Sequence, residues 1–213
     1  MLLSGGIDSA TCLYIFKKKG YRNRALTILF HRIARGEVSS ARRIALAANV
    51  IEHRIIEIPN LKEIGDMEAN SSFKGLPPTY IPARNMVFYS LAASFAEEIG
   101  ANYIVGGHNR DDLRAFEDTR REFFAGLQKT IWSSSDRLRE NRTTILRPLQ
   151  HKTKPEVISL AASLGVPLGL TWSCHAEGDV PCLKCEGCIK RSEAFAIAKV
   201  GDPLENPSTH TNV

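Results

Sequence analysis

The chain has 213 residues, of which 43% are hydrophobic and 24% are charged. This length and composition fit one large globular domain and exclude a disulfide-stapled miniprotein, a collagen-like chain and a low-complexity chain. No apolar run approaches the roughly 18 residues that a membrane helix requires, and no signal peptide opens the sequence. We therefore expect a cytoplasmic protein with no membrane partner.

The net charge of +5 is mildly basic. Such a charge is compatible with nucleotides, anionic small substrates or nucleic acid. The densest basic runs, residues 17–19 and 120–121, are too short to form a binding stripe. A cationic cleft is therefore favoured, and direct binding of nucleic acid is not expected.

Strands and helices alternate along the chain, which predicts a doubly wound parallel α/β sheet. The expected strands cover residues 1–3, 25–30, 54–58, 103–105 and 144–146. The expected helices cover residues 7–19, 41–48 with Ser39 as the cap, 84–99, 117–132, 154–164 and 189–199. Residues 60–80 are expected to be a surface excursion. Ligands of such sheets bind beyond the carboxyl ends of strands, which here means after Leu3, Phe30 and Gly106.

The loop between the first strand and the first helix is rich in groups that bind anions: it reads Ser4, Gly5, Gly6, Ile7, Asp8, Ser9. The glycines let the backbone approach an anion, and the helix start supplies free N–H groups. Asp8 could cap the helix or help to hold Mg²⁺. The loop is neither a Walker loop nor GxGxxG. It resembles the loop of the N-type ATP pyrophosphatases, which cleave ATP between its α and β phosphates.

Four of the five cysteines crowd into one segment with the spacing C-x7-C-x2-C-x2-C: Cys174, Cys182, Cys185 and Cys188. Four thiolates suit a tetrahedral Zn²⁺ with no open position for catalysis. An iron–sulfur cluster and free thiols are the alternatives. His175 is a spare candidate ligand, although an exposed loop residue is the favoured interpretation.

Two further segments carry candidate binding residues. Arg84 and Asn85 open a helix, where Arg84 can grip a phosphate or a carboxylate and Asn85 can hydrogen-bond. The residues after the strand at 103–105 form a polar run, Gly106, Gly107, His108, Asn109, Arg110, Asp111 and Asp112. Asp111 could bind Mg²⁺ or the substrate, or be a plain turn residue.

The loop at 4–12, the segment IPARNMVF at 81–88, the D-x-R-x-E-F pattern at 118–123 and the segment 171–191 with its cysteines together resemble the QueC family, the 7-cyano-7-deazaguanine synthases. The resemblance spans nearly the whole chain. It implies an adenine nucleotide alpha hydrolase-like fold, with an ATP-binding domain at 1–170, a zinc knuckle and closing helix at 171–200 and a flexible tail at 201–213.

The resemblance also implies a reaction and its residues. A 7-carboxy-7-deazaguanine would be adenylated by ATP, aminated by ammonia and adenylated again as the amide to give the nitrile. Catalytic roles would belong to Asp8, Ser9, Arg84 and Asp111. The nucleotide would contact Leu3, Ser4, Gly5, Gly6, Ile7, Asp8, Ser9 and Phe30. The acceptor would contact Arg84, Asn85, Gly107, His108, Asp111, Phe116, Asp118 and Arg120. Members of the family are often homodimers.

Three features depart from the family pattern. Only three residues precede Ser4, so either the first strand is short or the start has been assigned wrongly. Residues 30–34 read FHRIA where a Tyr-Gly-Gln turn is usual, and residues 107–116 read GHNRDDLRAF, with Phe116 as the expected aromatic partner. Adenylation is thus better indicated than the acceptor.

Two other functions remain open from the sequence. One is a tRNA-modifying enzyme of the same superfamily, although only Cys12 would remain outside the knuckle for sulfur chemistry. The other is a zinc-knuckle module that binds nucleic acid without catalysis, which would leave the loop at 4–9 without a purpose.

Overall fold

The structure, a computed structural model, describes residues 1–30, 35–59, 61, 81–176 and 178–205. The turn at 31–34, nearly all of the expected excursion at 60–80 and the end of the expected tail at 206–213 lie outside the described residues.

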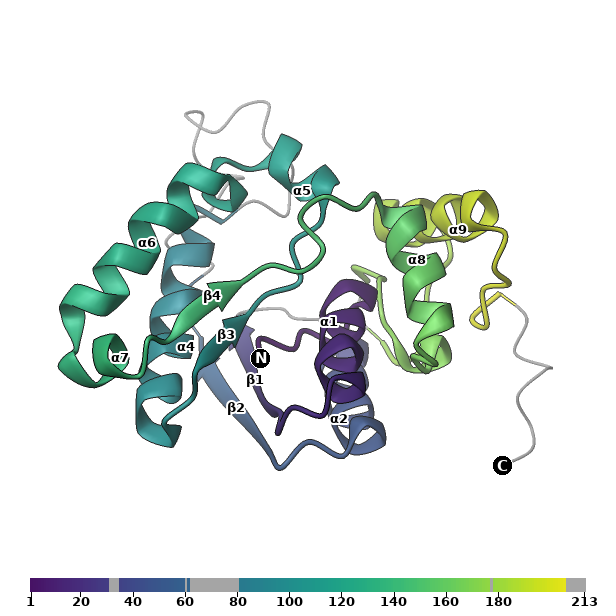
Figure 1. The fold of residues 1–213 in the computed structure, drawn as a ribbon. Helices are drawn as coiled ribbons and strands as arrows, with labels where there is room; N and C mark the ends of the chain where they lie inside the picture. The colour runs from purple at the N-terminus through teal and green to yellow at the C-terminus, as the bar shows by residue number, and fades with distance from the viewer. Residues whose placement is uncertain (31–34, 60, 62–80, 177, 206–213) are drawn as a thin grey trace.

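The strands lie side by side at the centre of the molecule (Figure 1). Strand β1 (Arg24–Phe30) pairs in parallel with β2 (Glu52–Ile58), and β3 (Tyr103–Val105) pairs in parallel with β4 (Thr144–Leu146).

Residues 1–3 join the two pairs of strands. The Leu2 N–H donates to the Val105 carbonyl at 2.9 Å, and the Leu3 N–H donates to the Leu26 carbonyl at 2.9 Å. The order across the sheet is therefore β2, β1, residues 1–3, β3 and β4. The short first strand is thus paired on both sides.

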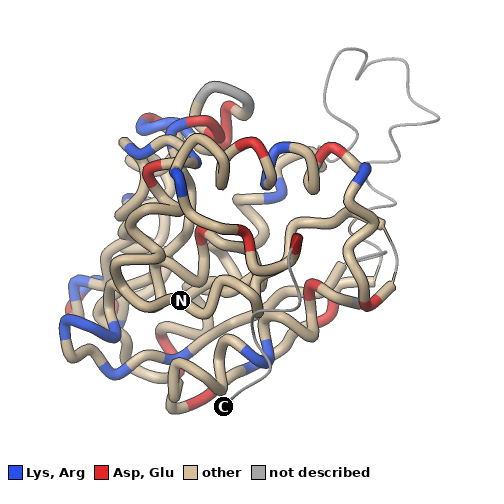
Figure 2. The backbone as a smooth tube through the Cα atoms, turned by 90° about the vertical axis from the view of Figure 1, so that its right-hand side faces the viewer, with Lys and Arg blue, Asp and Glu red and all other residues tan. Residues whose placement is uncertain are grey.

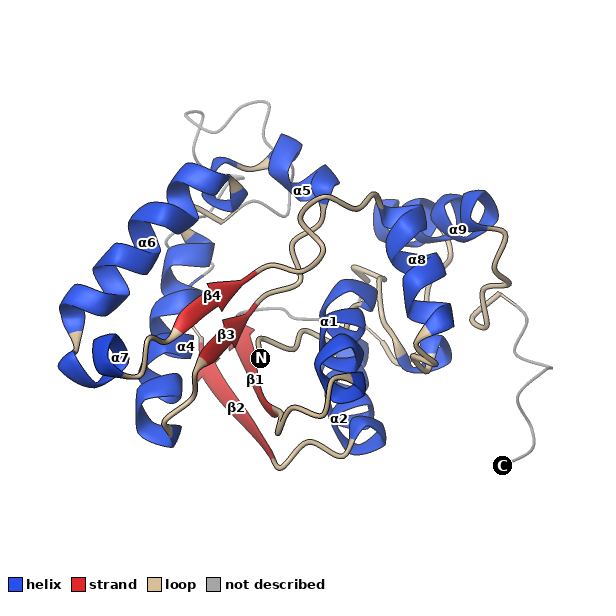
Figure 3. Ribbon diagram, viewed as in Figure 1, coloured by secondary structure: helices blue, strands red, loops and turns tan. Residues whose placement is uncertain are grey.

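Helices cover both faces of this sheet (Figures 1 and 3). One group of helices consists of α1 (Ile7–Lys18), α2 (Arg35–Ala48), α8 (Lys154–Ser163) and α9 (Glu186–Ala198). The other group consists of α4 (Arg84–Ile99), α6 (Arg121–Ser134) and α7 (Asp136–Glu140). Each group packs over its own apolar cluster, one built around Leu13 and Ile158 and the other around Phe124 and Ile104. The predicted α/β class with a parallel sheet is confirmed.

Two expected helices differ from those observed. Helix α2 begins at Arg35, so the exposed Ser39 lies inside the helix and does not cap it. The helix expected at 117–132 is divided into the 3₁₀ turn Glu117–Thr119 and α6, and a short helix α5 (Arg110–Ala115) precedes both. The Thr119 hydroxyl donates to the Phe116 carbonyl at 2.6 Å and so competes with a continuous helical ladder.

Acidic and basic positions are interspersed over the side of the molecule seen in Figure 2. Within the described ranges, no helix combines the length and the apolarity needed to cross a membrane.

A buried ion pair fixes the C-terminal helix. The Arg191 guanidinium binds the Asp202 carboxylate through two hydrogen bonds of 2.7 and 2.9 Å, and it donates to the Thr171 hydroxyl at 2.9 Å and to the Leu168 carbonyl at 3.1 Å. Asp202 is buried, so the chain is held at this point, where a flexible tail was expected from residue 201. A short 3₁₀ turn at Leu168–Leu170 supplies the carbonyl.

Arg191→Ala should lower the free energy of unfolding by about 3–5 kcal/mol, because it leaves the Asp202 carboxylate buried without a partner. Lys190→Ala is the matched control, since Lys190 is exposed and pairs with Glu186 on the same helix. It should cost at most about 0.5 kcal/mol. Urea denaturation of both variants measures the difference, and equal losses would contradict this role of the pair.

Candidate functional site

The loop at 4–9 is held by its own serines. The Ser9 hydroxyl donates to the Gly6 carbonyl at 3.0 Å and accepts the Ser4 N–H at 3.2 Å, while the Ser4 hydroxyl accepts the Gly6 N–H at 3.2 Å. Gly6 supplies no capping side chain to α1. The first turn of α1 therefore presents backbone N–H groups toward the carboxyl end of the sheet, where an anion can bind.

Gly5 allows α2 and the C-terminal segment to close around this loop. Its φ of +88° favours glycine, and an added Cβ would lie 2.8 Å from the Ala41 nitrogen and collide with the Glu37 carbonyl. The Gly5 carbonyl accepts the Trp172 N–H at 2.9 Å. The loop is thus fixed from two sides.

A cavity of about 290 Å³ opens beside this loop, at the carboxyl ends of residues 1–3, β1 and β3. The lining residues that the sequence predicted are Leu3, Ser4, Asp8, Ser9, Phe30, Arg84, Asn85, Gly107 and His108. Others were not predicted, among them Thr27, Glu37, Phe88 and Tyr89. Four separate segments of the sequence, within 2–9, 26–38, 84–89 and 106–108, therefore meet at one place, as expected for the switch point of a doubly wound sheet.

Asp8 lines the cavity and contacts two polar side chains from other parts of the chain. Its carboxylate forms an ion pair with the Lys154 ammonium and accepts from the Asn109 side-chain amide at 3.3 Å. Asn109 caps α5 in a capping box with Asp112. Lys154 was not predicted as a site residue; its place at the start of a helix directly after a strand and loop could have indicated it.

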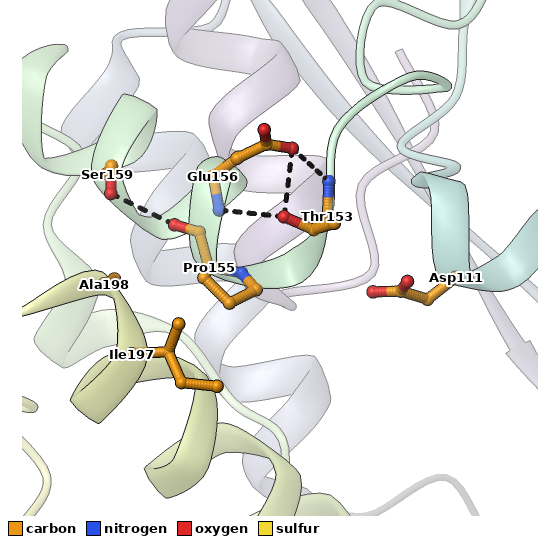
Figure 4. Close-up of a pocket in the computed structure, with 7 residues that line it drawn as sticks. All are labelled: Asp111, Thr153, Pro155, Glu156, Ser159, Ile197 and Ala198. Atoms are coloured by element: carbon orange, nitrogen blue, oxygen red, sulfur yellow. Dashed lines mark hydrogen bonds between the residues drawn. The ribbon is translucent and has the colours of Figure 1, made fainter.

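Asp111 contacts the backbone of Lys154 and lies away from the cavity at Asp8. Its carboxylate accepts the Lys154 backbone N–H at 3.2 Å, and its side chain lines a second, open cavity of about 550 Å³ (Figure 4). That cavity also touches Thr153, Glu156 and Ile197. Asp111 therefore contacts the Lys154 backbone and not the cavity at Asp8.

The residues after α5 that were expected to bind the acceptor lie in different surroundings, and none of them lines the cavity. The Asp118 carboxylate accepts the Asn85 N–H at 3.2 Å, and the Asn85 side chain donates to the Asp118 carbonyl at 3.1 Å, so Asp118 supports the start of α4. Arg120 is half-exposed and pairs with Glu117 at 3.7 Å. Neither Asp118 nor Arg120 lines the cavity of about 290 Å³, and neither does Phe116.

Burial shifts the pKa values of two titratable side chains at the cavity. Burial raises the pKa of Glu37 to about 7, against the opposing effect of the Arg84 guanidinium. Burial, and then the nearby Arg147 and Arg84, lower the pKa of His108 to about 4, so this imidazole is neutral at pH 7. The cavity thus contains both a charged wall and a neutral wall.

The four clustered cysteines lie together as predicted. Their sulfur atoms all lie within 4.8 Å of one another, with Cys185 3.9 Å from Cys174 and 3.6 Å from Cys188. A tetrahedron with metal–sulfur bonds of about 2.3 Å has edges of about 3.8 Å, so the spacing fits one tetrahedral ion. Backbone N–H groups donate to the sulfurs, for example from Cys182 to Cys174 at 3.3 Å. The exposed His175 is not part of the cluster.

The family model described as "Queuosine biosynthesis protein QueC" matches residues 1–199. The chain belongs to the QueC family. A 7-cyano-7-deazaguanine synthase from Oceanobacillus iheyensis is 35% identical over 96% of this chain and 96% of its own length. One from Archaeoglobus fulgidus is 35% identical over 96% of this chain and 88% of its own length. Membership in a family of synthases makes this chain an enzyme.

A solved structure shows the same fold at greater distance. The NMN synthetase from Francisella tularensis superposes with a TM-score of 0.56 over 94% of this chain and 76% of its own length, at 18% identity. This likeness concerns the fold alone. This QueC family member therefore shares its fold with a synthetase to which its sequence is only 18% identical.

Glu37→Gln should change the dependence of stability on pH. A carboxyl whose pKa is raised from 4.5 to about 7 favours the folded state below pH 4.5, and this contribution is lost as the pH rises through 7. The free energy of unfolding of the variant, relative to the parent chain, should therefore rise by roughly 3 kcal/mol between pH 4.5 and pH 8. Denaturation at both pH values measures it. Glu37→Met should behave alike, and parallel pH curves for variant and parent would contradict the shift.

Proposed function

We propose that this chain converts 7-carboxy-7-deazaguanine and ammonia to 7-cyano-7-deazaguanine while ATP is cleaved to AMP and pyrophosphate. The observation that carries the proposal is the cavity at the carboxyl end of the sheet, where the loop at 4–9, the Asp8–Lys154 pair and Arg84 meet. The names of the relatives support the choice of product.

The nucleotide would lie against the loop. Ser4, Ser9 and the N–H groups of residues 5–7 would bind the pyrophosphate that leaves, with the buried Ile7 anchoring the loop in the core. Phe30 and Leu3 line the cavity at the ends of their strands, where the adenine would bind. Asp8 is the carboxylate beside which the Mg²⁺ of the nucleotide would bind, and Lys154 and Asn109 hold it in place.

The acceptor would enter from the side of α4 and β3. Arg84 is the cation that would orient the carboxylate, and Asn85, Gly107 and His108 lie around the same space. Asp111 would act through Lys154, and Asp118 through Asn85, as positioning residues. Arg120 and Phe116 would contact the acceptor only from outside the cavity described above.

The chemistry requires two activations because a carboxylate oxygen is a poor leaving group. One carboxylate oxygen attacks the α phosphorus of ATP, and pyrophosphate leaves. Ammonia adds to the acyl carbon, and AMP leaves with that oxygen, which gives the amide. The amide oxygen attacks the α phosphorus of a second ATP, and pyrophosphate leaves again. Loss of AMP and of the two nitrogen protons then gives the nitrile. Both oxygens of the acid thus leave on AMP, and backbone donors and cations absorb the charge.

The cysteine cluster would hold a structural Zn²⁺. Four sulfur ligands leave no open position, so the ion would stabilise the segment at 171–200 and take no part in the reaction. We propose this segment as a unit that closes onto the nucleotide-binding part at 1–170, working in the cytoplasm.

The experiment is an incubation with Mg²⁺, ATP, ammonium and the acid labelled with ¹⁸O in its carboxylate, read by mass spectrometry. We expect the nitrile and AMP carrying one ¹⁸O atom per molecule. AMP with only the amide would place a block before the second activation. A folded protein that forms no AMP and leaves the acid unchanged would reject the proposal, and tRNA would be tested as the acceptor.

Asp8→Asn should lower AMP formation at least 100-fold, because it removes the carboxylate charge that Lys154 and the Mg²⁺ of the nucleotide would share, while the fold persists. Asp136→Asn, an exposed position on α7, is the control and should retain the rate of the parent chain. Retained AMP release by Asp8→Asn would remove this carboxylate from the mechanism.

Cys185→Ser should lose the bound zinc and lower the melting temperature, because a hydroxyl replaces one of four thiolates. Elemental analysis should give one zinc per chain before the change and much less than one after it. Cys12→Ala, a cysteine buried in α1 away from the cluster, should retain the metal. Full zinc content in Cys185→Ser would contradict a closed four-sulfur site.

A further inference from the structure

The neutral wall of the cavity contains a buried hydroxyl without a partner. Tyr89 on α4 has 0% of its surface exposed, and its hydroxyl has no hydrogen-bond partner among the described residues. Burial raises the pKa of this phenol, so the hydroxyl remains a proton donor. A buried polar group without a partner is costly, which makes its presence beside a ligand cavity informative.

The hydroxyl lies where ligands of this fold bind. A side chain at Gly106, directly after β3, would collide with the Tyr89 hydroxyl. Tyr89 and Gly107 also line the cavity together with the loop at 4–9. Glycine at position 106 thus lets the backbone after β3 lie directly beside the hydroxyl, at the end of the strand where the cavity opens.

His108 completes this wall. Its ring stacks on Tyr89 with centroids 5.8 Å apart and planes 27° apart, and it lies 5.3 Å from the ring of Phe124. The Arg147 guanidinium lies 4.2 Å from the Phe124 ring and disfavours a second positive charge. The neutral imidazole therefore offers one nitrogen as a donor and one as an acceptor.

We propose that the Tyr89 hydroxyl and the His108 imidazole form a neutral subsite that hydrogen-bonds the cyclic amide edge of the acceptor's heterocycle. A cyclic amide presents a carbonyl oxygen and an N–H side by side. The carbonyl oxygen would accept from Tyr89, and the N–H would donate to the unprotonated nitrogen of His108. This inference rests on the proposed function and goes beyond it by naming the residues that select the base.

The neutrality of the pair distinguishes its ligand from the nucleotide. Phosphates are bound by cations and by clustered backbone N–H groups, which the loop at 4–9 supplies. A neutral donor and acceptor match an uncharged amide and leave the carboxylate to Arg84. Sites built on such hydrogen bonds reject analogues that lack the matching group.

Tyr89→Phe separates ligand recognition from folding. Because the hydroxyl has no partner among the residues that the structure describes, its removal should leave the melting temperature equal or higher. Calorimetry with 7-carboxy-7-deazaguanine should show binding weakened at least fivefold, while ATP affinity changes less than twofold. Tyr103→Phe, at the opposite end of β3, is the control and should leave both affinities unchanged. Unchanged binding of the acid by Tyr89→Phe would overturn the inference.

Two further arms test the pairing. His108→Phe keeps an aromatic ring but removes both nitrogens, and it should weaken the acid in the same way. The 2,6-diamino analogue keeps the carboxylate and the 2-amino group of the acid, but it has an amino group in place of the amide oxygen and no proton on the adjacent ring nitrogen. It should bind the parent chain at least tenfold more weakly than the acid, and Tyr89→Phe should reduce this preference. If the parent chain turns over the acid while the variants bind it normally, the subsite is rejected and the proposed function stands. If the parent chain neither binds nor converts the acid, both are rejected.

Discussion

The pairing of residues 1–3 between β1 and β3 is the constraint on which the site depends. Leu2 and Leu3 bridge two pairs of strands that are otherwise separate, and the Met1 amino group donates to the Arg24 carbonyl at 3.0 Å. Burial lowers the pKa of this amino group to about 6. Because buried backbone groups must be paired, the position of this segment is fixed, and so is the point at which the loop at 4–9 leaves the sheet.

That placement brings opposite electrostatic environments into one cavity. On one wall, Asp8 and Lys154 form an ion pair that is only partly exposed. On the other, the stacked Tyr89 and His108 carry no charge at neutral pH. For the reaction proposed above, a substrate that is anionic at one end and neutral at the other would be favoured in one orientation, which would align its reacting group.

Much of this could be predicted from the sequence because the elements obey local rules. Helix α4 runs over the residues expected, since an apolar period is closed by a glycine in the left-handed region. The loop at 4–9 and the cysteine cluster were found because their residue types are rare at those spacings. The segment at 110–120 was not predicted correctly. Asn109 caps the short helix α5, which was not expected, and the Thr119 hydroxyl bonds where a single helix was expected over 117–132.

The site residues that sequence reasoning missed share one property. Glu37 and Tyr89 line the cavity, and Lys154 reaches Asp8, only because the fold brings together segments that are distant in sequence. Adjacent residues can also differ in role. Asp111 lines the open cavity of about 550 Å³, whereas the neighbouring Asp112 takes part in the cap of α5. A one-residue difference on a helix changes the face, which a linear pattern does not resolve.

The contact between Trp172 and the anion-binding loop also affects how the protein is made. The Trp172 backbone N–H donates to the Gly5 carbonyl, and the Trp172 indole packs against Gly36 on α2. The indole leaves no room for a side chain at position 36. The loop at 4–9 therefore reaches its final contacts only after the segment around Trp172 has been synthesised. Such long-range closure slows folding and leaves apolar surface open during synthesis. The closed form of the loop at 4–9 is thus gained late in folding, although its residues precede Trp172 in the chain.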